Sequence, residues 1–216
     1  MTIKKHLAIR GLYVIIDPTM CKTNSILDIT EAILSGGANI IQYRDKNSPL
    51  KEQIEIAKNI KKLCQKYKSL FIINDFPEIA IKSNSDGVHI GQDDTSIYEA
   101  KTILNSNQII GTSNNNLNEV SESSKENADY IAVGALYATK TMGKDIRKTV
   151  GPNLIKQSKN ITDKPIVGIG GINKSNIHEV IDAGADAICI VSEIISNSNP
   201  ELITREFADI IQSKLK

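Results

Sequence analysis

The chain has 216 residues, 40% of them hydrophobic, which suits one sizeable core and a single domain over 1–216. Its 26 Lys and Arg residues nearly balance its 25 Asp and Glu residues, and Trp is absent, which argues against nucleic-acid binding. There is no apolar run of the roughly 18 residues that a membrane span requires. Three dispersed cysteines without a CxxC motif fit a reducing compartment. We therefore expect a soluble, cytoplasmic monomer or small homo-oligomer without nucleic-acid or membrane partners.

The first half of the chain alternates apolar runs with amphipathic segments. Residues 1–11 are expected to form an N-terminal tail or an extra helix, and Gly36-Gly37 is a typical helix stop. The apolar runs predict strands over 12–17, 38–43, 70–73 and 87–90. The segments with helical spacing predict helices over 26–34, 50–67 and 77–82.

The second half continues the same alternation. It predicts strands over 109–112, 129–134, 165–169 and 186–191, and helices over 96–104, 117–127, 152–159, 174–183 and 200–215. Eight strand–helix units in about 200 residues, with strands apolar on both faces, indicate a single (β/α)8 TIM barrel. A doubly wound open sheet is the alternative, but it seldom needs eight parallel strands in so short a chain.

Carboxylates follow the third and fourth predicted strands in the stretch FIINDFPEIAIKSNSDGVHIGQDD, residues 71–94. Neighbouring parallel strands lie roughly 5 Å apart, so Asp75 and the pair Asp93-Asp94 should emerge close together. Carboxylates that converge in this way call for a cation, and Mg²⁺ with substrate phosphate oxygens meets that need. The alternative is that Asp75 and Asp94 only cap the helices that follow them.

Cationic and hydroxyl side chains stand at other strand ends. Gln42, Arg44 and Lys46 share one parity, so an extended chain would point all three the same way, toward a polyanion. Ion pairing at a solvated strand end is the alternative for these residues. Ser113 follows the fifth strand, where its hydroxyl could bind phosphate or cap the next helix.

The long loop after the sixth strand carries Thr139, Lys140, Thr141 and Lys144. Long loops in compact domains are often functional, so this one suits a mobile cover over phosphates, with a merely flexible loop as the alternative. The seventh and eighth strands end at Gly170-Gly171 and at Val191-Ser192. Small residues there let backbone N–H groups approach an anion, and this is the usual phosphate site of such barrels.

Other chemistries find little support in the sequence. His89 alternates with Val88 and Ile90 inside a predicted strand, which favours a hydrogen-bonded histidine of the core or pocket wall over a catalytic base. We find no Ser/His/Asp order, no His/Cys metal cluster and no isolated strand-end lysine, which disfavours acyl transfer and aldolase chemistry. The residues therefore predict transfer of a group from a metal-bound diphosphate to a phosphorylated acceptor, by a dissociative displacement.

An ordered set of motifs resembles the thiamine-phosphate synthase (thiamine-phosphate pyrophosphorylase) family over nearly the whole chain. The motifs are QYRDK at 42–46, IIND at 72–75, DGVHIGQDD at 86–94, GTS at 111–113, DYIAVGALYATKT at 129–141, GIGGI at 168–172 and VS at 191–192. The resemblance implies a transferase of thiamine biosynthesis that joins a pyrimidinylmethyl diphosphate to a thiazole phosphate, or to its carboxylated form. It implies loss of diphosphate to leave a pyrimidine-methyl cation, which the thiazole nitrogen then attacks.

The resemblance also implies roles for individual residues. The pyrimidine diphosphate would be held by Gln42, Arg44, Lys46, Asn74 and Ser113. The thiazole phosphate would be held by Thr139, Thr141, Gly171, Val191 and Ser192. Asp75 and Asp94 would bind the cofactor Mg²⁺, and no residue would act as a single catalytic acid or base. Arg44, Lys46 and Ser113 would instead act by positioning.

Two departures from the family pattern stand out. Asp45 replaces the usual Glu, at a position expected to face away from the ligand. Met142 replaces a lysine that resembles a diphosphate contact, and Lys140 or Lys144 is a hypothetical substitute for it.

Three alternatives to the synthase each account for part of the sequence. A related thiazole tautomerase resembles the form with a His after the strand-six glycine, whereas this chain has Gly134-Ala135. A non-catalytic binding protein would explain Met142. A sugar-phosphate epimerase or isomerase would need a base at a strand end, and it would leave the diphosphate features unexplained.

Overall fold

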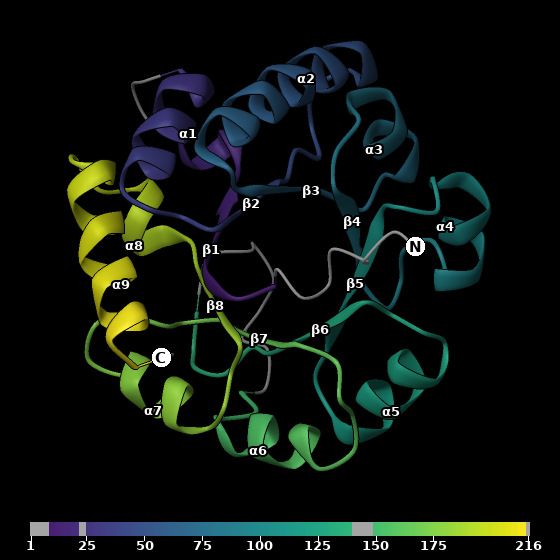
Figure 1. Ribbon diagram of the computed structural model, residues 1–216, viewed down its shortest axis with the longest axis vertical. Helices are drawn as coiled ribbons and strands as arrows, with labels where there is room; N and C mark the ends of the chain where they lie inside the picture. The colour runs from purple at the N-terminus through teal and green to yellow at the C-terminus, as the bar shows by residue number, and fades with distance from the viewer. Residues whose placement is uncertain (1–8, 22–24, 140–148, 215–216) are drawn as a thin grey trace.

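Eight parallel strands close into a barrel in the computed structural model, which describes residues 9–21, 25–139 and 149–214. Each strand pairs with the next along the chain, and β8 pairs with β1 to complete the ring (Figure 1). The strands are β1 Gly11–Ile16, β2 Ile40–Tyr43, β3 Leu70–Asn74, β4 Gly87–Ile90, β5 Ile109–Asn114, β6 Tyr130–Val133, β7 Ile166–Ile169 and β8 Ala187–Ile190. The predicted (β/α)8 barrel is confirmed.

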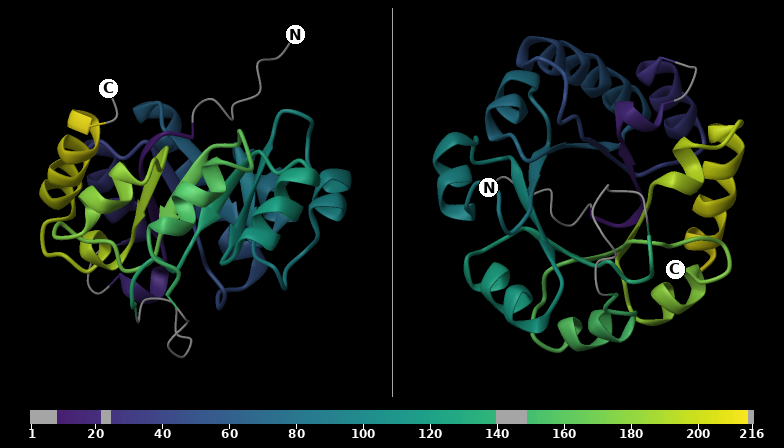
Figure 2. Two further views of the ribbon diagram at one scale, coloured as in Figure 1. Left: turned by 90° about the horizontal axis from the view of Figure 1, so that it is seen from below. Right: turned by 180° about the vertical axis from the view of Figure 1, so that it is seen from behind.

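Helices form an outer ring around the strands, as the views from the side and from behind in Figure 2 show. The helices are α1 Ile26–Ser35, α2 Leu50–Tyr67, α3 Pro77–Ser83, α4 Ile97–Ile103, α5 Leu117–Lys125, α6 Asn153–Lys159, α7 Ile177–Asp182, α8 Ser192–Ile195 and α9 Pro200–Lys214, with a 3-10 helix, η2, over Pro18–Met20. Local side chains fix several of their starts. The Ser96 hydroxyl and the Glu99 carboxylate, for example, form a capping box at α4.

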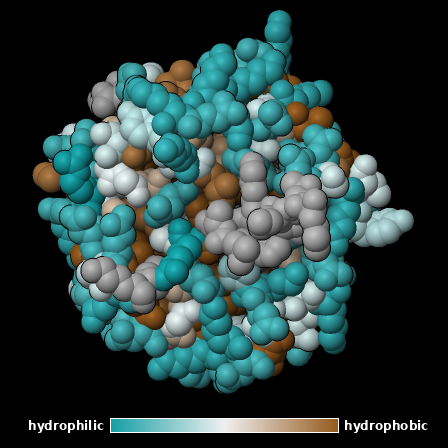
Figure 3. All heavy atoms as spheres, in the orientation of Figure 1, coloured by the Kyte–Doolittle hydropathy of each residue, from teal (hydrophilic) through white to brown (hydrophobic). Residues whose placement is uncertain are grey.

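Two apolar layers hold the barrel together. The larger layer fills the space between strands and helices, and it includes Ile33, Ile60 and Phe207. The smaller layer fills the barrel interior, where Tyr13, Tyr130 and Cys189 are almost completely buried. Strands that face both layers must be apolar on both faces, which explains their nearly continuous apolar runs. Hydrophilic residues make up most of the outer face seen in Figure 3.

Some predicted boundaries shift for local reasons. Helix α7 begins at Ile177 rather than at residue 174, because Asn173 and Asn176 accept hydrogen bonds from backbone N–H groups and form a turn before it. The 3-10 helix η2 and the one-turn helix α8 were not predicted, since neither is long enough to show a period. No helix in the described parts of the chain is long and apolar enough to cross a membrane. The expected tail or helix over 1–11 lies mostly outside the described residues.

Candidate functional site

Two carboxylates meet where β3 and β4 end. Asp75 and Asp94 lie within hydrogen-bonding reach of each other, and Lys46 Nζ lies 2.9 Å from Asp75 Oδ2. Burial raises the pKa of Asp75, the Asp94 carboxylate raises it further, and Lys46 opposes both effects. The backbone of Asp75 has φ of 64°, a conformation that non-glycine residues adopt seldom. The predicted convergence of the two carboxylates is therefore present.

The Asp94 carboxylate is held in place from its own loop. The Gly91 N–H donates to Asp94 Oδ2 over 2.7 Å. In the same loop the Gln92 amide donates to the Ser113 carbonyl oxygen over 2.6 Å, which joins the β4 and β5 strand ends. Gln92 was not singled out from the sequence, because an amide in a polar loop gives no pattern of its own.

Gln42, Arg44 and Lys46 at the end of β2 were predicted to point the same way, but they are divided between two environments. Arg44 and Lys46 line an open cavity, and Arg44 forms an ion pair with Asp17 at the end of β1. Gln42 is buried, and its amide donates to the Tyr13 hydroxyl over 2.7 Å. The Asp17 carboxylate also accepts hydrogen bonds from the Thr19 N–H and hydroxyl, so it fixes the position from which Arg44 reaches the cavity.

Asp45, between the two cations, faces away from the cavity as expected. Its carboxylate accepts hydrogen bonds from the Tyr43 hydroxyl and from the N–H groups of Asn47 and Ser48. Burial alone would raise the pKa of Asp45, but the hydrogen bonds lower it below the usual value. Its role in the structure is to shape the turn that carries Lys46.

The larger cavity has a volume of about 1170 Å³, and its lining mixes apolar side chains with charged and amide side chains. Its charged lining comprises Arg44, Lys46, Asp75, Asp93 and Asp94, with the hydroxyl residue Ser113 alongside. Amides from the β5–α5 connection, from the start of α5 and from α6 also line it, among them Asn115, Asn118, Asn153 and Gln157. Asn74 is half-buried at the end of β3 and is not part of this lining.

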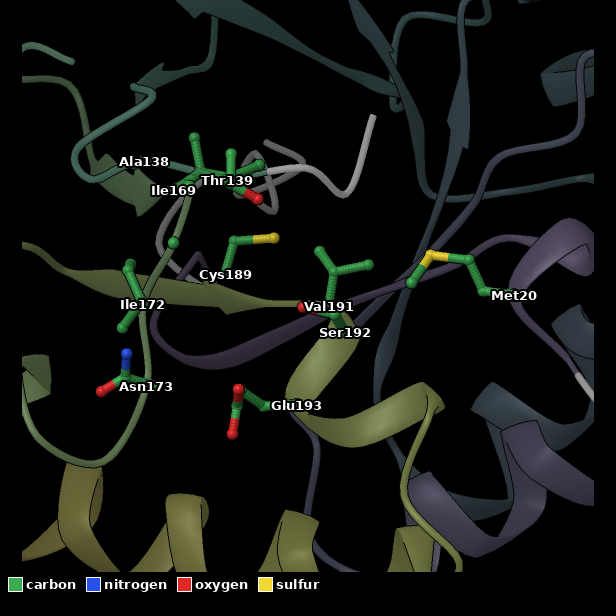
Figure 4. Close-up of a pocket in the computed structure, with 12 residues that line it drawn as sticks. Met20, Ala138, Thr139, Ile169, Ile172, Asn173, Cys189, Val191, Ser192 and Glu193 are labelled. Atoms are coloured by element: carbon green, nitrogen blue, oxygen red, sulfur yellow. The ribbon is translucent and has the colours of Figure 1, made fainter. Parts of the chain in front are cut away.

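A smaller cavity of about 430 Å³ lies at the ends of β7 and β8. Gly170, Gly171, Val191 and Ser192 line it together with Thr139, and Figure 4 shows the side chains of Met20 and Cys189 reaching toward its middle. The Gly171 backbone has φ of 65°, and a Cβ there would lie 2.7 Å from the Ala138 carbonyl oxygen. Glycine at this position therefore lets the β7 end pack directly against the β6 loop.

The two cavities share a wall. Thr139, Ile169 and Gly170 line both of them, so ligands in the two cavities would lie side by side. Glu193 also lines the smaller cavity and adds a carboxylate to its wall. The predicted contacts Lys140, Thr141 and Lys144, and the departure Met142, lie outside the described residues.

His89 is a hydrogen-bonded histidine of the barrel interior. Its Nδ1 lies 3.0 Å from the Tyr130 hydroxyl and its Nε2 lies 2.9 Å from Ser113 Oγ. Burial lowers the pKa of His89 to about 4, and the Asp94 charge offsets this effect only in part. The ring is therefore neutral at neutral pH, which agrees with the prediction of a hydrogen-bonded histidine in the core or pocket wall.

The two carboxylates are a suitable partial ligand set for Mg²⁺. Within the described ranges, no group of three or more His, Cys, Asp or Glu side chains is placed to hold a metal. Mg²⁺ characteristically uses only one or two protein carboxylates and completes its shell with water and substrate phosphates. Burial and the neighbouring Asp94 carboxylate both raise the pKa of Asp75. A cation bound between the two carboxylates would relieve their repulsion.

The fold and the site define the class of protein: a (β/α)8 barrel enzyme with two adjoining cavities at the strand ends. The family model for thiamine monophosphate synthase matches residues 12–194, and the chain belongs to this family. It is 38% identical over 216 residues to thiamine-phosphate synthase of Methanosarcina mazei, covering 97% of this chain and 89% of that protein.

A second relative and a solved structure agree with this assignment. Thiamine-phosphate synthase of Methanospirillum hungatei is 39% identical over 201 residues, covering 93% of this chain and 97% of the relative. The structure of thiamine phosphate pyrophosphorylase from Pyrococcus furiosus superimposes with a TM-score of 0.88 at 32% identity, covering 98% and 99% of the two chains.

Proposed function

We propose that the chain is a thiamine-phosphate synthase, which joins a pyrimidinylmethyl diphosphate to a thiazole phosphate and releases diphosphate. The observation that carries this proposal is the pair of cavities with a common wall at Thr139, Ile169 and Gly170. A diphosphate in the larger cavity and a monophosphate in the smaller one would bring the two heterocycles together between them. The family membership supports the same reaction.

The larger cavity supplies the groups that the departing diphosphate needs. Arg44 and Lys46 would bind its oxygens, with Arg44 oriented by Asp17. Asp75 and Asp94 would hold Mg²⁺, which when bound supplies positive charge to the leaving group. Lys46, now paired with Asp75, would be released toward the diphosphate once that carboxylate has another partner. Gln42, Asn74 and Ser113 would hold the rest of the pyrimidine substrate.

The smaller cavity suits the phosphorylated acceptor. Gly171, Val191 and Ser192 would hold the thiazole phosphate, with Thr139 and Thr141 from the β6 loop. Excluding water at the shared wall would protect a pyrimidine-methyl cation until the thiazole nitrogen attacks it. No general base is required for this displacement, which agrees with the neutral, hydrogen-bonded state of His89.

Product formation from purified protein tests the function. Pyrimidine diphosphate, thiazole phosphate and Mg²⁺ should together give diphosphate and thiamine phosphate, the latter followed by fluorescence after oxidation. We expect omission of any one component, or the change Asp75→Ala, to abolish turnover. Binding of both ligands without product would instead favour a tautomerase or a binding protein.

Lys140 and Lys144 are proposed to replace the family lysine that is Met142 here. We expect the double change to alanine to weaken diphosphate affinity and to slow turnover. Unchanged turnover and affinity would end this proposal. We further propose that the protein acts in the cytoplasm on soluble small molecules, as a monomer or small homo-oligomer.

A further inference from the structure

A continuous chain of hydrogen bonds crosses the inside of the barrel beneath the larger cavity. It runs from Gln42 Nε2 to the Tyr13 hydroxyl over 2.7 Å, and from there to the Tyr130 hydroxyl over 3.0 Å. It continues to His89 Nδ1 over 3.0 Å, and from His89 Nε2 to Ser113 Oγ over 2.9 Å. Its two ends, Gln42 and Ser113, are the residues that the proposed function assigns to the pyrimidine substrate.

The barrel is shaped around the middle of this chain. Tyr130 is fully buried, and Tyr13 is 2% exposed. Gly111 lies opposite Tyr130 in the β5–β6 register, where a Cβ would come within 1.9 Å of Tyr130 Cζ. The Tyr130 ring thus lies across a strand position that only glycine leaves open, and this brings its hydroxyl between Tyr13 and His89.

Proton counting fixes the direction of the chain. Each tyrosine hydroxyl has one proton, and a neutral imidazole has one ring proton. Because Gln42 donates to Tyr13, the Tyr13 proton goes to Tyr130 and the Tyr130 proton goes to His89 Nδ1. The ring proton of His89 must then be on Nε2, where it is donated to Ser113 Oγ. The reverse direction would require the opposite orientation of the Gln42 amide.

The two ends of the chain are left with opposite polarity. The Ser113 hydroxyl accepts from His89, so its own proton is available for a hydrogen bond to a group in the larger cavity that Ser113 lines. The Gln42 Oε1 atom accepts no hydrogen bond from the described residues, and none of their fully buried side-chain polar atoms lacks a partner. Oε1 therefore has an unused acceptor position, on a side chain that is 2% exposed.

We propose that Tyr13, Tyr130 and His89 are positioning residues that make Ser113 a hydrogen-bond donor and Gln42 an acceptor toward the ligand. This inference rests on the proposed function for the identity of that ligand. An aminopyrimidine offers a matching ring-nitrogen acceptor and amino donor. The corresponding oxo-pyrimidine has the two polarities exchanged, with a ring N–H and a carbonyl oxygen. The hydrogen-bond chain thereby makes the protein select amino-substituted over oxo-substituted pyrimidine diphosphates.

A spectroscopic test examines the direction of the chain without reference to activity. The protein contains three histidines, His6, His89 and His178, so ring-nitrogen NMR of ¹⁵N-histidine-labelled protein can be assigned by a His89→Gln variant. We expect His89 in the Nε2–H form at neutral pH, and loss of this preference in Tyr130→Phe. An Nδ1–H form in the unaltered protein would overturn the proposal whether or not the enzyme is a synthase.

A double-mutant cycle tests the effect on substrate. We expect Tyr130→Phe to lower kcat/KM for the amino-pyrimidine diphosphate by about tenfold, the scale of one hydrogen bond, without changing KM for the thiazole phosphate. The same change in a Ser113→Ala background should have less than about a twofold effect, because the donor it orients is gone. The matched control is Tyr43→Phe, which removes a buried hydroxyl on β2 that is not part of the hydrogen-bond chain.

Selectivity provides the final outcome. The unaltered protein should prefer the amino over the oxo diphosphate by more than about 100-fold, since a site built around hydrogen bonds rejects mismatched analogues strongly. Tyr130→Phe should lower this ratio, whereas Tyr43→Phe should preserve it. Equal losses of kcat/KM from Tyr130→Phe with and without Ser113 would show a merely structural role and would overturn the proposal.

Discussion

The change Gly111→Ala should disrupt the barrel interior more than any ordinary strand substitution. The new Cβ would meet Tyr130 Cζ at 1.9 Å and its two Cε atoms at 2.2 and 2.4 Å, whereas ordinary contact begins at 3.4 Å. The Tyr130 ring cannot yield cheaply, because it is fully buried and its hydroxyl is bonded to Tyr13 and His89. Overpacking of this kind costs about 1–3 kcal/mol. Loss of the two hydroxyl bonds adds about 1 kcal/mol each.

We therefore expect Gly111→Ala to lower the free energy of unfolding by about 3–5 kcal/mol, and the melting temperature by roughly 10 °C. Urea unfolding followed by circular dichroism measures the first quantity. The matched control is the same alanine in a Tyr130→Leu background, where the ring is gone and the added cost should fall below about 1 kcal/mol. A cost of similar size in both backgrounds would refute the assignment of the clash to the Tyr130 ring.

Two further predictions concern pH and charge. The raised pKa of Asp75 stabilises the fold only below its unfolded value of about 3.9, and this contribution is lost as pH rises through the folded value. Asp75→Asn should therefore raise the free energy of unfolding of the metal-free protein at pH 7 by about 1 kcal/mol. It should also remove any rise in melting temperature that Mg²⁺ causes. A lower free energy of unfolding of the metal-free variant would contradict this prediction. The pKa of His89 is lowered to about 4, so between about pH 6.5 and pH 4 the unfolded state binds more protons than the folded state. The free energy of unfolding should therefore decrease by up to about 3 kcal/mol as the pH is lowered from about 6.5 to 4. This fall should be absent from His89→Gln, and equal pH profiles would contradict the assignment.

Residues whose placement depends only on strand order were the most predictable from the sequence. The convergence of Asp75 and Asp94 follows from two consecutive parallel strands, and the shared parity of Arg44 and Lys46 follows from the pleat. The Gly170-Gly171 end of β7 follows from the usual geometry of such barrels. Each of these features needs only local pattern and chain order, and the structure places each one on a cavity wall.

Contacts that depend on barrel closure were beyond sequence reasoning. Tyr13 and Tyr130 are separated by 117 positions, and their hydroxyls meet only because β1 and β6 face each other across the interior. The Asp17 partner of Arg44 was also missed, although β1 and β2 are neighbouring strands, because Asp45 is closer in sequence; Asp45 instead accepts a hydrogen bond from Tyr43. Helix α8 follows a predicted strand directly and spans only Ser192–Ile195, too short for a helical period to appear.

Steady-state kinetics with the two substrates varied separately tests the two-site account most directly. We expect Arg44→Gln to raise KM for the pyrimidine diphosphate about tenfold or more, since it removes a charge-assisted contact, while KM for the thiazole phosphate stays within about twofold. Ser192→Ala should show the reverse pattern. If both variants raised KM for the same substrate, or if neither changed either value, the assignment of one anion to each cavity would be contradicted.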